Sequence, residues 1–329
     1  MIIKTVTVKL VTPAMIGGSE AGRCDDPPTL RPPAIRGMLR FWTRALAGDQ
    51  PSDLESELWG STDVGQGISI LNAVRLPVAR NHVIFVRGGF HDTEMCSPDD
   101  EESTISLRIP DERVLCPLRA VVWTWLHLGA VGRRSRRGYG SLLWVPCEKD
   151  DDLLRGWEKL DPARDLVSSD ALAQYLKRGF AQMRSESRGN LIRVPDPRSD
   201  RSCSRWFQLK TLDQIFVGGR VPDQVINTDG GLDRLIHGLA WDFRSTNNIV
   251  RSQMGGSGGK RLASPIMWRL FPTPDRSYIP VMTWSPREDI TRIPRQEKGP
   301  NGHVQPTGIY HYLHEKLGFQ KSLANKDLG

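Results

Sequence analysis

Hydrophobic and polar residues alternate along residues 2–11, which predicts a half-buried β-strand. Four further segments of the first half also read as strands: 68–76, 82–85, 103–109 and 141–147. Residues 34–47 instead repeat apolar positions with the helical period, and 116–131 is apolar enough for a buried helix. The order is β-α-β-β-α-β with one extra hairpin, which predicts a ferredoxin-like unit of the RRM type.

The second half has a weaker pattern. Its predicted elements are helices at 171–185 and 231–243, strands at 264–271 and 277–284, and a last helix within 305–323. A degenerate second copy of the first unit fits this order. The predicted fold class is therefore α+β, with two ferredoxin-like (RRM-type) domains in tandem and long loop insertions. We assign residues 1–150 to the first domain, with a glycine-rich loop, and 151–329 to the second, with an arginine-rich insertion.

The chain has 329 residues, enough for two domains, and its 38% hydrophobic residues are typical of a folded protein. No apolar run reaches the roughly 18 residues of a membrane span, and the alternating N-terminus differs from a signal peptide. We therefore expect a cytoplasmic protein. The five cysteines are scattered without a C-x-x-C pair, which argues against a disulfide framework or a structural zinc site. We expect neither a metal nor a cofactor.

The formal charge is +7, from 45 lysines and arginines against 38 acidic residues, and the excess lies in residues 151–329. Most of the basic residues are arginine, whose planar guanidinium matches phosphate and stacks on bases. The bias favours nucleic acid as a partner, although a GC-rich genome would raise arginine everywhere.

The densest cluster of charge is AVGRRSRRGYGSLLW at 130–144, between the second predicted helix and the strand that follows. Glycines allow positive φ and leave backbone amides open to phosphate, and four arginines so close together repel unless anions neutralise them. We therefore expect contact with a nucleic-acid backbone, with a solvated turn as the alternative. The predicted contacts are Arg133, Arg134, Arg136 and Arg137, with Tyr139 either stacked on a base or packed inward.

The first predicted helix has an apolar stripe and, about a third of a turn away, a basic one. The apolar stripe is Ile35, Leu39, Trp42 and Leu46, and the basic stripe is Arg36, Arg40 and Arg44, with Arg31 in the preceding loop. A solvated basic face explains these arginines as well as RNA contact does. Amides at the helix start would favour a phosphate there.

Two basic regions lie in the second half. MGGSGGKRLASP at 254–265 lacks the first glycine and the final Ser or Thr of a Walker A loop, so we reject nucleotide hydrolysis and expect Lys260 and Arg261 to contact phosphates. The stretch 184–210 interleaves basic residues with Trp206 and Phe207, which fits single-stranded nucleic acid or, equally, a solvated loop.

Candidates for catalysis are few. The histidines form no H-E-x-x-H motif, and His127, inside an apolar helix, is expected to be a core residue with its hydrogen bonds satisfied. Asp25 and Asp26 could bind a divalent metal beside the basic helix, although the sequence DDPP is more typical of a plain turn. We assign no catalytic residue.

Three motifs together are more specific than any one of them. LVTPAMIGGSE (10–20), LRPPAIRGMLRFWTRAL (30–46) and GAVGRRSRRGYGSL (129–142) resemble the RAMP superfamily of CRISPR proteins, and within it the first-numbered subunits of the type III-B Cmr effector complex. The resemblance implies two ferredoxin-like domains, assembly with other Cmr subunits, and contacts with the 3′ region of a CRISPR guide RNA and with target RNA. It implies no nuclease activity, because target cutting belongs to another subunit.

Two alternatives to this hypothesis remain open at the level of the sequence. The chain could be a metal-dependent endoribonuclease that uses Asp25 and Asp26, or a scaffold whose basic loops bind acidic protein surfaces. RNA affinity should fall steeply with salt if the loops bind phosphates.

Overall fold

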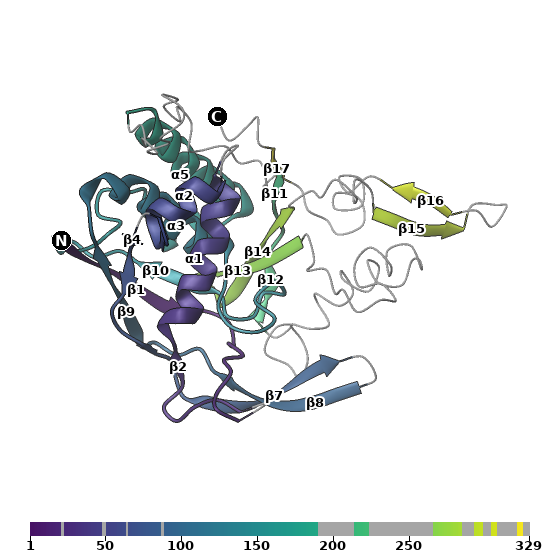
Figure 1. Ribbon diagram of the computed structural model, residues 1–329. Coiled ribbons are helices and arrows are strands. Elements are labelled where there is room, and N and C mark those ends of the chain that lie inside the picture. The colour runs from purple at the N-terminus through teal and green to yellow at the C-terminus, as the bar shows by residue number, and fades with distance from the viewer. Residues whose placement is uncertain are drawn as a thin grey trace.

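The computed structural model combines helices with antiparallel sheets, which confirms the α+β class (Figure 1). It describes residues 1–20, 23–47, 51–63, 65–86, 89–189, 214–223, 266–284, 293–298, 304–307 and 321–324. No helix in these ranges is long and apolar enough to cross a membrane.

The first sheet has four strands in the order β10-β1-β9-β5. Its central pair is β1 (Ile2–Leu10) and β9 (Glu102–Ile109), flanked by β10 (Leu142–Val145) and by the two-residue β5 (Ser69–Ile70). The helices α1 (Pro32–Leu46) and α3 (Leu115–Leu128) lie between these strands along the chain. The β-α-β-β-α-β order of the first half is therefore confirmed.

Several elements of the first half differ from the prediction. The helix α2 (Pro51–Trp59) and the strand β8 (Gly89–Cys96) were not expected, and β8 pairs with β7 (Ala79–Val86) in a hairpin that reaches away from the first sheet (Figure 1). The strand predicted at 68–76 is interrupted, because β5 joins the first sheet while β6 (Val74–Arg75) pairs with β2 (Thr29–Leu30). The remaining short elements are β3 (Gly60–Ser61), β4 (Gly65–Gln66), a 3-10 turn at Glu112–Val114 and α4 (Pro162–Asp165).

The second sheet has five strands, in the order β12-β14-β11-β17 with β13 also paired to β14. These strands are β11 (Gln214–Val217), β12 (Val221–Pro222), β13 (Ile266–Pro272), β14 (Ser277–Trp284) and β17 (Lys321–Ala324). The predictions for β13 and β14 are confirmed. The predicted helix at 171–185 is α5 (Ser169–Gly189), which contacts β11 and β17.

Other predictions for the second half fare differently. The segment expected to be a loop after β14 contains β15 (Ile293–Lys298), which pairs with β16 (Val304–Thr307). A helix was expected within 305–323. The two ends of this range belong to the strands β16 and β17, and its middle lies outside the described residues. The helix predicted at 231–243 also lies outside them.

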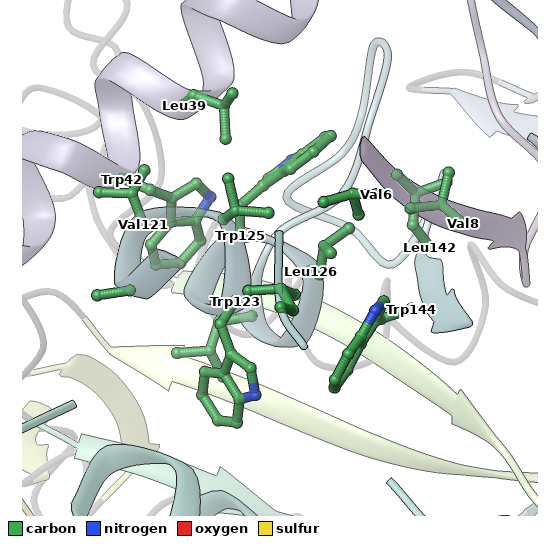
Figure 2. Close-up of a cluster of buried hydrophobic side chains, with 14 of the residues drawn as sticks. Val6, Val8, Leu39, Trp42, Val121, Trp123, Trp125, Leu126, Leu142 and Trp144 are labelled. Atoms are coloured by element: carbon green, nitrogen blue, oxygen red, sulfur yellow. The ribbon is translucent and has the colours of Figure 1, made fainter. Parts of the chain in front are cut away.

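The centre of the molecule is α3, which is apolar on every side, as its sequence LCPLRAVVWTWLHL requires of a buried helix. Figure 2 shows Trp123, Trp125 and Leu126 of α3 beside Val6 of β1 and beside residues of α1 and β10. The same helix contacts β13 and β14 of the second sheet. The two sheets therefore share a hydrophobic core through α3.

The predicted place of His127 in the hydrophobic core is confirmed. Its side chain is buried, its Nδ1 lies 2.7 Å from the carbonyl oxygen of Trp123, and its Nε2 lies 2.7 Å from the Tyr175 hydroxyl. Burial, together with the nearby charge of Arg269, lowers the pKa of His127 to about 3. The imidazole is therefore neutral at physiological pH.

Candidate nucleic-acid interface

The glycine-rich loop, residues 129–142, joins α3 to β10 and lies against the segment that follows β1. The buried Thr12 hydroxyl donates to the Gly138 carbonyl at 2.6 Å and accepts from the Ser141 amide at 2.9 Å. Because this one hydroxyl both donates and accepts, it closes the loop onto the first motif, LVTPAMIGGSE. Two of the three motifs in the sequence therefore meet in space.

Two positions of the loop need glycine because another backbone segment approaches each of them closely. Gly132 has a φ of 81° and Gly140 a φ of 68°, a region that other L-residues rarely adopt. A Cβ atom at Gly132 would lie 2.6 Å from the carbonyl oxygen of Met15, and one at Gly140 would overlap the carbonyl oxygen of Val131. These glycines serve tight packing of the loop.

The backbone amides of the loop are largely used within the chain. Amides at positions 131, 133, 137, 140 and 141 donate to Gly140, Met15, Arg134, Pro13 and Thr12 respectively. These amides do not form the open phosphate cradle expected from the sequence, because each already has an acceptor. Any phosphate contact at these positions must come from side chains.

The loop arginines have different surroundings. Arg133 is exposed, and its amide donates to the Met15 carbonyl at 2.8 Å. The Arg136 guanidinium is half-buried and lies 5.4 Å from the ring centroid of Phe41 on α1, and burial lowers its pKa. Arg134 has a positive φ of 60°, and it and Arg137 are half-buried. Arg133 is thus the most exposed arginine of the loop.

Tyr139 is only 3% exposed, so its proposed role as a platform for a base is wrong. Of the two orientations open at the level of the sequence, the ring takes the inward one. Stacking on a base needs an exposed ring face. The burial follows from the tight path of the loop between Gly138 and Gly140, both of which have positive φ.

The basic stripe of α1 faces α2. The Nε of Arg40 lies 2.5 Å from Glu55, an Nη of Arg44 lies 2.8 Å from the same carboxylate, and the Arg36 guanidinium donates to the Trp59 carbonyl. The side chains of Arg40 and Arg44 nevertheless remain 43% and 49% exposed. Burial raises the pKa of Glu55, but the hydrogen bonds from Arg44 and Arg40 outweigh it, so the pKa lies below its ordinary value.

The start of α1 does not offer the amides that the sequence suggested for a phosphate. Its first two residues are Pro32 and Pro33, which have no N–H. The amides of Ala34 and Ile35 both donate to the Arg31 carbonyl, at 2.9 and 3.3 Å. The expectation of a phosphate on these amides is therefore wrong.

Asp25 is held by neighbours on both of its oxygens. The Ser19 amide donates to one at 2.9 Å, and Arg31 donates to the other at 2.5 Å. The hydrogen bond from Arg31, with that from Ser19, lowers the pKa of the Asp25 carboxyl. These bonds give Asp25 a structural role in its loop, and Asp26 beside it is exposed. Within the described ranges, no group of three His, Cys, Asp or Glu is arranged to hold a metal ion.

One residue at this interface was missed from the sequence. Arg269 of β13 is 1% exposed, and its guanidinium donates to the Gly129 carbonyl at 3.1 Å and to the Leu142 carbonyl. Burial lowers its pKa to about 9. The sequence does contain an indication of this residue, because a single arginine interrupts the otherwise apolar run IMWRLF. A charge buried in such a strand needs hydrogen-bond partners.

Other predicted residues are not placed. Lys260, Arg261 and the stretch 190–210 lie outside the described residues, whereas 184–189, expected to be loop, belong to α5. Cys24, Cys96, Cys116 and Cys147 form no disulfide bond, and Cys203 lies outside the described residues.

Comparison with known proteins agrees with the motifs. The RAMP superfamily matches residues 7–143. CRISPR system Cmr subunit Cmr1-1 of Pyrococcus furiosus is 26% identical over 215 residues, which is 59% of this chain and 61% of that protein. Cmr1-2 of the same organism is 24% identical over 180 residues, 41% of this chain and 91% of that protein. The match to Cmr1-1 therefore covers less than two thirds of its length.

Among solved structures, the apo form of Cmr1 from Pyrococcus furiosus superposes with a TM-score of 0.56. It covers 96% of this chain and 97% of that one, at 17% sequence identity. Likeness at this identity concerns the fold alone.

Proposed function

From the match of the RAMP superfamily to residues 7–143, we propose that this chain is an RNA-binding subunit of a type III-B CRISPR (Cmr) effector complex. Its partners are the other Cmr subunits, the 3′ region of a CRISPR guide RNA, and target RNA. It acts in antiviral defence without cutting RNA itself, inside the cytoplasm. Similarity to Cmr subunits of Pyrococcus furiosus supports this assignment.

One observation carries the proposal for RNA: the glycine-rich loop has a backbone tied down by internal hydrogen bonds, and it presents Arg133 to solvent. A cation on a pre-organised backbone binds phosphate at a low ordering cost. Such contacts fix RNA in position and carry no sequence information, which suits a complex whose specificity comes from base pairing.

The proposed contacts combine the loop with the half-exposed arginines of α1. They are Arg31, Arg36, Arg40, Arg44, Arg133, Arg134, Arg136 and Arg137, joined by Lys260 and Arg261 from the second half. Arg31, just before α1, reaches Asp25, and the α1 arginines reach Glu55 and Trp59, each with part of its guanidinium. Their exposed remainder would contact phosphate.

We further propose that the two sheets belong to two ferredoxin-like domains, residues 1–150 and 151–329. The order β10-β1-β9-β5 with α1 and α3 between the strands supports this for the first. A helix packed on a second antiparallel sheet supports it for the second.

Binding of labelled single-stranded RNA by the full chain over a range of salt concentrations tests the proposal. The affinity should fall steeply with salt, and the variant R133A/R134A should reduce the slope of log affinity against log salt by about 1 to 1.5. The matched control is R155A, which removes an exposed arginine that pairs with Asp150 away from the loop. Binding that ignores salt, or an equal loss in the control, would contradict the proposal.

The non-catalytic assignment has its own test. Labelled RNA incubated with the chain and a divalent metal should remain intact. A cleavage product that disappears in D26A would overturn the assignment, and D26A suits this test because Asp26 is exposed.

A further inference from the structure

We propose that three consecutive residues of β13, Trp268, Arg269 and Leu270, act as a clamp that holds the glycine-rich loop in its RNA-contacting shape, with Arg269 as the positioning residue. The inference rests on the proposed function, since the loop arginines are taken to contact RNA. It adds a role for the second half of the chain in shaping a surface of the first.

The clamp contacts the loop at its beginning, middle and end. The Trp268 amide donates to the Arg136 carbonyl at 3.0 Å. The Arg269 guanidinium donates to carbonyls at the two ends, Gly129 and Leu142. The Leu270 amide lies 3.3 Å from Ser141 Oγ, which itself donates to Gly138. The loop is thus bonded to β13 at both of its ends and at Arg136.

Arg269 suits this position because of its shape. A guanidinium presents five N–H donors in a planar fork, so it can bond two carbonyls that approach from different directions. The ring of Phe271, with its centroid 4.5 Å from the guanidinium carbon, adds a favourable contact with the cation. A lysine carries its charge at one point and has no such fork.

The burial of Arg269 indicates a specific role. Burying a cation is costly, and replacing a buried charge by an apolar residue often leaves a protein equally stable. The strand IMWRLFP could be apolar throughout and still pair with β14. What an apolar residue could not do is hold both ends of the loop, and the loop carries the proposed RNA contacts.

The clamp can be tested in the full chain with R269M and R269K. Wild type and variants are digested briefly with trypsin under native conditions, and cuts after Arg133, Arg134, Arg136 and Arg137 are mapped by mass spectrometry. Loss of two buried hydrogen bonds should raise loop cleavage about tenfold in R269M. Cleavage after Arg155, outside the loop, should not change. R269K should behave like R269M, because the charge alone does not bridge the two carbonyls.

RNA binding separates positioning from direct contact. R269M should weaken RNA affinity about three- to tenfold while leaving the salt slope unchanged, because all loop cations remain. R133A/R134A should instead reduce the slope. The control L107A removes buried side-chain volume from β9, which pairs with β1 and β5 and not with β13, and should lower stability without raising loop cleavage.

A milder variant covers the case in which R269M does not fold. S141A removes the acceptor for the Leu270 amide, and should raise loop cleavage about threefold. Unchanged loop cleavage in S141A and R269M, or full restoration by R269K, would overturn the clamp. An open loop with unchanged RNA affinity would overturn the positioning role if R133A/R134A does lose affinity. If R133A/R134A also keeps its RNA affinity, the proposed RNA contact is wrong, and the clamp has only a structural role.

Discussion

Two groups of arginines lie near each other in this chain, and they are held in opposite ways. On α1 the guanidinium groups are engaged, since Arg40 and Arg44 pair with Glu55 of α2. In the glycine-rich loop the backbone is engaged, and Arg133 extends into solvent from it. The difference teaches that the density of positive charge does not identify an RNA surface. What matters is which part of each residue the fold has already used.

The largest expected effect comes from disturbing the closely packed backbone of the glycine-rich loop. G140A forces a Cβ atom onto the Val131 carbonyl at a positive φ, and should cost about 3 kcal/mol in the free energy of unfolding. Urea unfolding followed by circular dichroism measures it. The matched control is G65A, because Gly65 has a similar φ of 84° with open space around its Cβ. It should cost only about 1 kcal/mol.

Equal losses in G140A and G65A would mean that backbone strain alone matters and that the loop is not closely packed against Val131. A loss in G140A without any loss in G65A would place the whole cost in the contact. Either result would change the account of why glycine stands at position 140.

The sequence predicted the elements whose pattern is local. The alternation of β1 and β9 and the helical period of α1 follow from which side chains face the core. The helix α2 was not predicted because its sequence, PSDLESELW, is short and mostly polar. Without α2 the α1 stripe had no visible partner, so its engagement with Glu55 could not be foreseen.

Side-chain orientation in the candidate site was beyond the sequence for a different reason. A tyrosine between two glycines looks the same in the sequence whether it packs inward or outward, and its burial depends on the path of the whole loop, which Thr12 and β13 hold by hydrogen bonds. Arg269 lies more than a hundred residues from the loop that it holds, and no local pattern joins them. The motifs did identify the loop itself, through the resemblance to RAMP proteins.

As the pH falls, the stability contributed by His127 in the core should be lost before that contributed by Glu55, which pairs with Arg40 and Arg44 of α1. The folded state depresses the pKa of His127 from 6.5 to about 3, so its contribution to stability is complete above pH 6.5 and is lost as the pH falls toward 3. At pH 5 the loss should be about 2 kcal/mol. The pKa of Glu55 is also depressed, but from 4.5, so its contribution declines only below that pH.

Urea unfolding of wild type and H127Q at pH 7.5 and pH 5.0 measures this difference. Glutamine can keep a hydrogen bond to the Trp123 carbonyl without titrating, so H127Q should lose about 2 kcal/mol less than wild type between the two pH values. The same pH dependence in both proteins would show that His127 is not buried in its neutral form.

The smallest expected effect concerns the engaged arginines. E55Q removes the charge that pairs with Arg40 and Arg44, and because both arginines are more than two fifths exposed, water compensates part of the loss. Stability should fall by about 1 kcal/mol. If these arginines also contact RNA, a neutral partner competes less with phosphate, and RNA affinity should rise about twofold with a steeper salt dependence. The matched control is D150N, which removes the exposed partner of Arg155. A fall in affinity in E55Q alone would show that Glu55 orients the α1 arginines for RNA, and the two groups would then differ less than their contacts indicate.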